Sequence, residues 1–167
     1  MPTLPGYDEI TELPAQVTGR VGPEHLDQNG HMNIRHYFGL GDQTLLTRFE
    51  ELGFGDGYLE RTGFTTFTAE HHLRYFDELR PGSEFSTHTR LLARSAKSLH
   101  VIVLLTNRSA RTLAFTFEAM ILHIDIAQRR TALFPDEVAT ALDAAIARDN
   151  SVDWTAPLGG AMAIRGG

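Results

Sequence analysis

A single long helical pattern precedes four consecutive strand-like segments, and this order leaves few folds open to the chain. From Ile34 onward, apolar side chains recur three or four residues apart through Tyr37 to Leu52, a spacing that marks one face of a helix. Asn33 is a good N-cap directly before this pattern, and Gly53 is a good stop after it. We therefore predict one long amphipathic helix between these two residues.

The strand-like segments are rich in aromatic and β-branched residues, and one of them alternates at period two. They are connected by the short stretches "DELRPG", "SAK" and "RSAR", which favour antiparallel pairing of consecutive strands. A short strand precedes the long helix, and a second helix with Pro135 at a starting position follows the sheet. In chain order the strand segments read "AQVTGRVG", "GFTTFTAEHHLRYF", "SEFSTHTRLLARS", "SLHVIVLLTN" and "RTLAFTFEAMILHID".

These elements predict an α+β fold. An antiparallel sheet must bury one face, and only the long helix is large enough to cover it. The length of 167 residues suits one domain. We expect an N-terminal arm over residues 1–14, one domain over 15–150 that includes the C-terminal helix, and a flexible glycine-rich tail over 151–167.

Composition excludes several classes of function. The net charge is -6 and no basic run exceeds "RR", which argues against nucleic acid as a partner. The absence of cysteine removes disulfides, thiolate nucleophiles and cysteine metal ligands. The adjacent histidines at 71 and 72 point to opposite faces of a strand, and no zinc-protease motif occurs, so no metal is expected. Apolar runs are too short to cross a bilayer and no secretory signal is evident, which favours a cytoplasmic protein.

Most of the candidate chemistry lies in one stretch, "HLDQNGHMNIRHY", directly before the long helix. It combines three imidazoles, one carboxylate and three carboxamides. One interpretation is a polar turn that caps the helix. The other is a catalytic loop, in which Asp27, Asn29 and His31 would be the reactive groups.

The D-x-N-G-H-M-N loop, followed by the long helix, resembles the hotdog-fold acyl-CoA thioesterases of the 4-hydroxybenzoyl-CoA thioesterase type. The stretches "FTAEHHLRYFDEL", "AKSLHV" and "FEAMILHID" bring it closest to the betainyl-CoA thioesterase branch, related to domains fused to L-carnitine dehydrogenases. The resemblance covers roughly residues 15–135. It implies a sheet wrapped around the long helix, and a homodimer or higher homo-oligomer with active sites at the subunit interface.

The resemblance also implies roles for the loop residues. Asp27 would act as general base or nucleophile toward the thioester, and the sequence leaves these two routes open. Asn29 would orient the substrate carbonyl or a water, and His31 would carry a proton. The alternative is that Asp27 only caps a turn while Asn29 and His31 bond the loop backbone. Coenzyme A is part of the substrate, so no separate cofactor is expected.

Further residues are predicted to bind the acyl-CoA. Backbone N–H groups at a helix start can bind a developing oxyanion, and the resemblance implies that this donor lies near Ile34. Gly30, Asn33 and Ile34 are therefore expected to bind the thioester. A short or polar acyl group is expected, with betainyl-CoA as the leading candidate. Its trimethylammonium group would be held by aromatic faces and carboxylates. The candidates are the aromatic residues Tyr37, Phe38, Phe64, Phe67, Tyr75 and Phe76 and the carboxylates Glu70 and Glu118. Asp42 and Glu78 are the alternative acids.

Two rival functions remain. Hotdog hydratases and dehydratases use a D-x-N-P-x-H motif with histidine five residues after aspartate. Here His31 is four residues after Asp27, and Gly30 replaces the proline, which disfavours that chemistry. A non-catalytic acyl-CoA-binding module is the other rival, and such a module has no need of Asp27.

Overall fold

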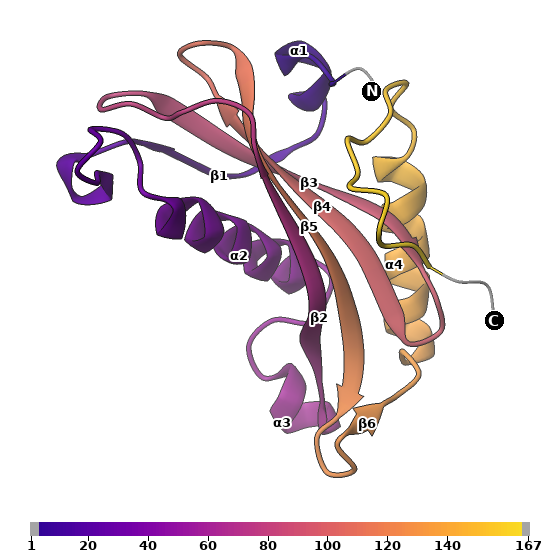
Figure 1. The fold of residues 1–167 in the computed structure, drawn as a ribbon. Coiled ribbons are helices and arrows are strands. Elements are labelled where there is room, and N and C mark those ends of the chain that lie inside the picture. Colours follow the sequence, from indigo (N-terminus) through magenta and orange to yellow (C-terminus); the bar gives the residue numbers. More distant parts are fainter. Residues whose placement is uncertain (1–3, 165–167) are drawn as a thin grey trace.

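The fold is one curved antiparallel sheet with a long helix against its inner face, as the sequence predicted (Figure 1). The computed structural model describes residues 4–164. The strand order is β1-β3-β4-β5-β2, and β6 pairs with β5. The strands are β1 Ala15–Arg20, β2 Phe64–Tyr75, β3 Glu84–Arg94, β4 Ser98–Asn107, β5 Thr112–Asp125 and β6 Arg130–Thr131.

The long helix α2, Ile34–Glu51, begins and ends where its caps predict. The Asn33 side chain accepts a hydrogen bond from the Arg35 backbone N–H at 3.1 Å, and Gly53 takes a left-handed φ of 88° after the last turn. The apolar face of α2 packs on the inner face of the sheet, and this contact forms the main core. Its central members are Tyr37, Leu45, Phe49, Val101, Val103, Phe115 and Phe117.

One predicted pairing is wrong. The short stretch after β2 suggested that β2 and β3 are neighbours, but β2 pairs with β5 at the opposite edge of the sheet. Residues 76–83 instead cross the end of the sheet beneath the start of α2. Three strand spacings amount to about 14 Å, and eight residues span this easily. Leu79, within the crossover, is fully buried.

The C-terminal helix α4, Asp136–Asp149, closes the part of the β3 edge that β1 leaves open. The Asp149 carboxylate accepts a hydrogen bond from the Leu91 backbone N–H at 2.9 Å. The Asn150 amide donates to the carbonyls of Leu91 and Leu92 at 3.1 and 3.0 Å. These side chains replace a neighbouring strand. Within the described chain, β2 is therefore the long edge that stays open.

Both ends of the chain pack on the outer face of the sheet. The helix α1, Tyr7–Ile10, lies in the segment predicted as an arm, and its Ile10 is buried. Trp154 and Ala156 are buried with it, so this part of the expected tail is fixed in place. The first three residues of the arm and the last three of the tail lie outside the described residues. The short helices η1, Pro23–His25, and α3, Tyr58–Thr62, complete the fold.

No helix in residues 4–164 combines the length and apolarity needed to cross a membrane.

Candidate active site

The stretch before α2 forms a tight turn that fixes Asp27. The Asp27 backbone N–H donates to the His31 carbonyl at 3.1 Å, and the Gly30 N–H donates to the Asp27 carbonyl at 3.1 Å. Gly30 has a φ of 79°, which explains a glycine at the tip. The Asn29 N–H donates to Asp27 Oδ1 at 2.8 Å. One carboxylate oxygen thus caps the turn, while Oδ2 has no hydrogen bond within residues 4–164.

The His31 imidazole lies between two carboxylates. Its Nδ1 is 4.0 Å from Asp27 Oδ1, and its Nε2 is 3.8 Å from Glu78 Oε2. The side chain of Asp27 is 19% exposed and that of His31 is 33% exposed. Glu78 also pairs with Arg80 at the surface. Glu78 comes from the crossover after β2, so the crossover brings a second acid to the loop.

A cavity of about 550 Å³ opens beside this histidine. Its walls come from the end of the loop, the first turn of α2, the end of β2 and the crossover. Its lining combines aromatic rings with carboxylates. The lining residues are His31, Met32, Ile34, Tyr37, Tyr75, Phe76, Asp77 and Glu78.

Tyr37, which lines this cavity, connects α2 to the crossover after β2. Its hydroxyl accepts a hydrogen bond from the Leu79 backbone N–H at 2.8 Å. Burial raises the pKa of the Tyr37 hydroxyl, which therefore stays neutral at physiological pH. Its ring stands edge-on to Tyr75, with centroids 5.4 Å apart. These two contacts fix the position of the Tyr37 ring in the cavity lining.

The start of α2 supplies a free backbone donor at the same place. The Arg35 N–H is capped by Asn33, and the His36 N–H bonds the Asn33 carbonyl at 3.0 Å. The Ile34 N–H has no partner among the described residues, and Ile34 lines the cavity. The positive end of the helix dipole lies directly behind this N–H, so the position suits a carbonyl oxygen that gains negative charge.

The structure brings some predicted site residues together and separates others. His31, Ile34 and Tyr37 line the cavity, whereas Asp27 does not line it and lies 4.0 Å from His31. Asn33 is the helix cap. The Asn29 side chain is exposed at the tip of the turn and makes no hydrogen bond in residues 4–164. Asp42 is exposed on α2.

Glu70 and Glu118 do not reach the cavity, because they lie on the outer face of the sheet. In β5, Phe117 and Ala119 point to the inner core, so Glu118 between them points outward. Glu118 is buried there, accepts from the Gly159 N–H at 2.6 Å, and lies 2.9 Å from the Nε2 of His100. Glu70 lies on the same face, because its Oε1 is 3.3 Å from Nε2 of His72, the residue that pairs with Glu118 across the two strands.

Sequence reasoning did not select Met32 or Asp77. Asp77 accepts from the Thr112 hydroxyl at 2.6 Å and from the Glu78 N–H at 2.9 Å, so it stiffens the crossover. The two adjacent acids in "FDEL" are the sequence feature that could have indicated Asp77. Their position at the cavity follows from the crossover, which sequence did not reveal.

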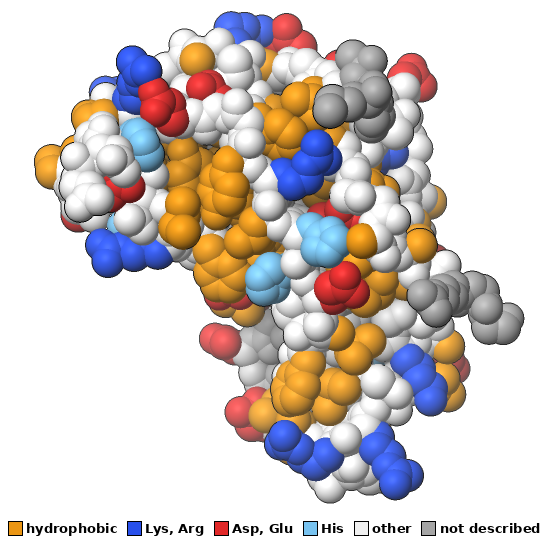
Figure 2. All heavy atoms as spheres, in the orientation of Figure 1, with side chains coloured by type: hydrophobic (Ala, Val, Ile, Leu, Met, Phe, Trp, Pro, Cys, Tyr) orange, Lys and Arg blue, Asp and Glu red, His pale blue; other side chains and the backbone are white. Residues whose placement is uncertain are grey.

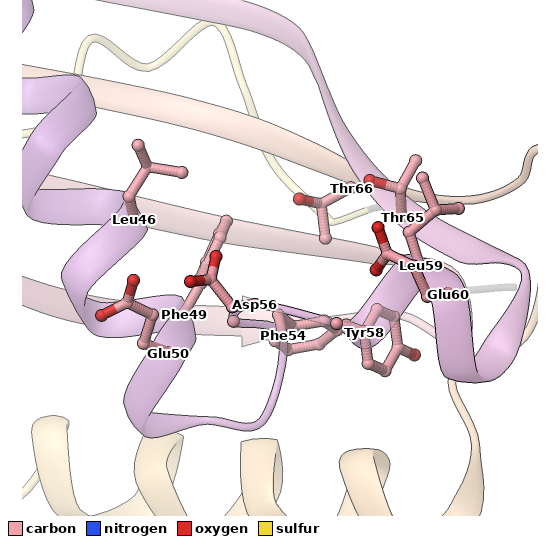
Figure 3. A pocket seen from close by; sticks show the side chains of 12 residues that line it. Leu46, Phe49, Glu50, Phe54, Asp56, Tyr58, Leu59, Glu60, Thr65 and Thr66 are labelled. Atoms are coloured by element: carbon pink, nitrogen blue, oxygen red, sulfur yellow. The ribbon is translucent and has the colours of Figure 1, made fainter.

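A second cavity, of about 410 Å³, lies at the other end of α2. Leu46 and Phe49 of α2, the loop before α3, and Thr66 of β2 surround it (Figure 3). None of the predicted catalytic residues lines it. The cavity beside His31 is therefore the better candidate for the chemistry.

Comparison with known proteins identifies the family of this chain. Residues 21–142 match the family model described as the thioesterase-like superfamily. The L-carnitine dehydrogenase/betainyl-CoA thioesterase of Agrobacterium fabrum is 34% identical over 119 residues, which are 71% of this chain and 24% of that protein. The betainyl-CoA thioesterase of Pseudomonas aeruginosa is 29% identical over 123 residues, 73% of this chain and 77% of that protein. The chain thus spans about a quarter of the bifunctional relative.

Solved structures share the fold. A hypothetical protein of Staphylococcus aureus, solved in complex with CoA, superposes with a TM-score of 0.81 at 27% identity, over 92% of this chain and 97% of that one. A 1,4-dihydroxy-2-naphthoyl-CoA thioesterase from Synechocystis superposes with a TM-score of 0.67 at 12% identity, over 76% and 93% of the two chains. These matches confirm the predicted hotdog fold. By the family model that covers most of its length, the chain belongs to the thioesterase-like superfamily.

Proposed function

We propose that this protein hydrolyses the thioester of an acyl-CoA, with Asp27 as the nucleophile or general base. The observation that carries the proposal is the arrangement at the start of α2. Among residues 4–164, one carboxylate oxygen of Asp27 and the backbone N–H of Ile34 have no hydrogen-bond partner. His31 lies between Asp27 and the cavity that Ile34 lines. A nucleophile or base next to an oxyanion donor is what acyl transfer requires.

In this proposal the thioester oxygen accepts a hydrogen bond from the Ile34 N–H. Asp27 Oδ2 then attacks the carbonyl carbon to form an anhydride, which water hydrolyses in a second step, or it removes a proton from a water that attacks the carbonyl carbon directly. His31, held between Asp27 and Glu78, delivers a proton to the departing thiolate and regains one from the water, directly or through Asp27. The hydrogen bond from the Asn29 N–H to Asp27 Oδ1 keeps the carboxylate oriented. The carboxylate therefore does not have to reorient during the reaction.

The direct test replaces Asp27 by Asn and measures release of free thiol from a panel of acyl-CoAs. Removal of one acid–base or nucleophilic group lowers turnover on the order of a hundredfold or more. Asp42→Asn is the matched control, because Asp42 is an exposed acid on α2 outside the cavity. Unchanged turnover in Asp27→Asn would refute the assignment. Tight CoA binding without thiol release from any substrate would favour a binding module instead.

The acyl group is proposed to be small and cationic, with betainyl-CoA as the leading candidate. Similarity to two betainyl-CoA thioesterases supports this. So does the lining of the cavity, which includes the aromatic residues Tyr37 and Tyr75 and the acids Asp77 and Glu78. Aromatic faces and carboxylates are the groups that bind a quaternary ammonium ion, which donates no hydrogen bond.

A pair of isosteric substrates tests the charge preference. Betainyl-CoA and 3,3-dimethylbutanoyl-CoA have nearly the same shape, but only the first is cationic. We expect betainyl-CoA to be cleaved at least tenfold more efficiently, and Tyr75→Leu to reduce that ratio. Equal rates for the two substrates, or a preference for palmitoyl-CoA, would rule out a cationic acyl group.

The protein is further proposed to be a homodimer joined along β2. This strand is open along its length, and apolar side chains gather beside it on the same side of the molecule (Figure 2). Along α2, Ile34, Phe38 and Leu46 are 66%, 40% and 57% exposed. A two-fold axis through the middle of β2 would pair the two edges antiparallel. It would also cover the apolar stripe that these three residues of α2 form.

Such a two-fold axis would also combine the two cavities. It places Tyr75 at the end of β2 beside Phe64 at the start of β2 in the second copy. The cavity of Figure 3 in one copy, which includes Thr65 and Thr66, then adjoins the cavity beside His31 in the other. Each active site would accordingly draw on both subunits.

A further inference from the structure

Four cationic side chains stand out because they make no hydrogen bond or ion pair with another described residue. They are Lys97, Arg108, Arg129 and Arg130, whereas the other Lys and Arg side chains in residues 4–164 each have a partner. All four are exposed. In a chain with a net charge of -6, unpaired cations gathered at one place mark a site for an anion.

Three of the four lie together at one end of the sheet. Lys97 is in the β3–β4 turn, and Arg129 and Arg130 are at the β5–β6 turn. The two turns are neighbours, because the His123 N–H donates to the Lys97 carbonyl at 2.9 Å and the Ala132 N–H donates to the His123 carbonyl at 2.9 Å. Figure 2 shows Lys and Arg side chains at the end of the molecule where Figure 1 places β6.

The turn itself does not require arginine at position 129. Arg129 has a φ of 55°, a left-handed conformation that glycine adopts without strain and other residues adopt at a cost of about 1 kcal/mol. Asp125 is the acid in this turn, and its Oδ1 already accepts the Gln128 N–H at 2.9 Å. The guanidinium of Arg129 is therefore free for a ligand.

From the proposed thioesterase function, on which this step rests, we infer that Lys97, Arg129 and Arg130 bind the nucleotide phosphates of the substrate's coenzyme A. Coenzyme A carries a diphosphate and a 3′-phosphate at the end remote from its thioester. Arginine suits such groups because its planar guanidinium can donate two parallel hydrogen bonds to one phosphate. Lys97 adds a point charge beside them.

Distance decides which active site these cations serve. In one chain, the cavity beside His31 lies at the Tyr75 end of β2, and the basic turns lie at the Phe64 end, about 35 Å away at the rise of a strand. This exceeds the reach of the pantetheine arm. Across the proposed two-fold axis, Tyr75 adjoins Phe64 of the second copy, and three strand spacings, about 14 Å, separate it from β6 there. The cations of one subunit would therefore bind the coenzyme A whose thioester lies in the other.

Kinetics with two forms of one substrate test the binding site. The full-length protein and Lys97→Gln/Arg130→Gln are assayed with the preferred acyl-CoA and with the same acyl group on N-acetylcysteamine, which has no phosphates. We expect KM for the acyl-CoA to rise about tenfold in the variant, the loss of roughly one charged hydrogen bond. Neither kcat nor the N-acetylcysteamine reaction should change.

Arg108→Gln is the matched control. Arg108 is also exposed and has no partner among the described residues, but it lies at the β4–β5 turn, at the other end of the sheet. It should leave KM unchanged. An unchanged KM in the double variant, or an equal rise in Arg108→Gln, would overturn the inference. If no thioester is cleaved, the proposed function fails, and calorimetric titration of both variants with coenzyme A still tests the binding site.

A mixed dimer tests whether the cations act on the other subunit. One chain carries Asp27→Asn and the other carries Lys97→Gln/Arg130→Gln, with different purification tags. If the cations act across the interface, one of the two sites contains every native residue, and a low KM returns. If they act within one chain, every active site that keeps Asp27 lacks the cations, and the high KM persists.

Discussion

The Tyr37 hydroxyl accepts the backbone N–H of Leu79 at 2.8 Å, and this contact joins the first turn of α2 to the crossover after β2. The Met32 N–H adds a second link, to the Leu79 carbonyl at 2.8 Å. Loop, helix and crossover thereby hold one another in place around the cavity, and His31 and Glu78 come from the two parts so joined.

Tyr37→Phe should therefore lower both stability and turnover. It leaves the buried Leu79 N–H without a partner, which costs about 1–3 kcal/mol. Chemical denaturation gives the stability change, and thiol release from the preferred acyl-CoA gives the rate. Tyr75→Phe is the control, because no partner of the Tyr75 hydroxyl occurs in residues 4–164. Equal effects of the two substitutions would show that the contact with Leu79 does not organise the site.

The buried ion pair between Arg48 and Asp149 should be costly to break. Arg48 Nη2 lies 3.1 Å from Asp149 Oδ1, and both side chains are buried. Asp149→Ala leaves the guanidinium without its main partner and the Leu91 N–H unpaired, a loss of about 3–5 kcal/mol. Asp143→Ala removes a surface partner of Arg94 and should cost at most about 1 kcal/mol. Denaturant midpoints compare the two, and similar losses would contradict the assigned burial.

Stability should fall as the pH drops below about 6.5. Burial lowers the pKa of His88 and of His123 below the ordinary value. The unfolded chain then binds more protons than the folded one, so the contribution of each histidine is complete above its unfolded pKa and is lost as pH falls toward its folded pKa. The slope reaches up to about 1.4 kcal/mol per pH unit for each histidine. In His88→Gln, urea denaturation between pH 7 and pH 5 should show a shallower slope, whereas an unchanged slope would exclude His88.

The oligomeric state should depend on the apolar stripe of α2, formed by Ile34, Phe38 and Leu46. Leu46→Lys puts a like charge from each subunit into the proposed interface, so light scattering should show a shift toward monomer at low protein concentration. Leu133 is 62% exposed between β6 and α4, away from this stripe. Leu133→Lys should therefore leave the dimer intact. A wild-type protein that is monomeric and fully active would defeat the dimer proposal and the shared active site together.

A chemical trap distinguishes Asp27 acting as a nucleophile from Asp27 acting as a general base. An acyl-Asp27 anhydride would be trapped by hydroxylamine as a hydroxamate on residue 27, whereas a general base would leave the protein unmodified. Rapid mixing with the preferred acyl-CoA, followed by peptide mass analysis, distinguishes the two routes. Asp27→Asn is the blank for this measurement.

The sequence by itself determined the elements and the loop. Helix α2 begins after Asn33 because the cap and the apolar spacing are local properties, and the strands follow from period-two patterns and β-branched residues. The proximity of Asp27 and His31 was predictable because it is also local. The two residues lie within five positions of one another, and their turn depends on Gly30.

Only the tertiary structure decided which elements became neighbours. A six-residue link suggested that β2 pairs with β3, but the curvature of the sheet lets the chain cross its end, and this crossing brings Asp77 and Glu78 to the cavity. Period-two alternation predicts which residues of a strand lie on the same face of the sheet. It does not predict which face of the sheet lies next to the active site. Glu118 was therefore expected at the substrate and lies beneath residues near Gly159 on the outer face. Long-range pairing depends on the summed burial of the whole sheet, and no local stretch encodes it.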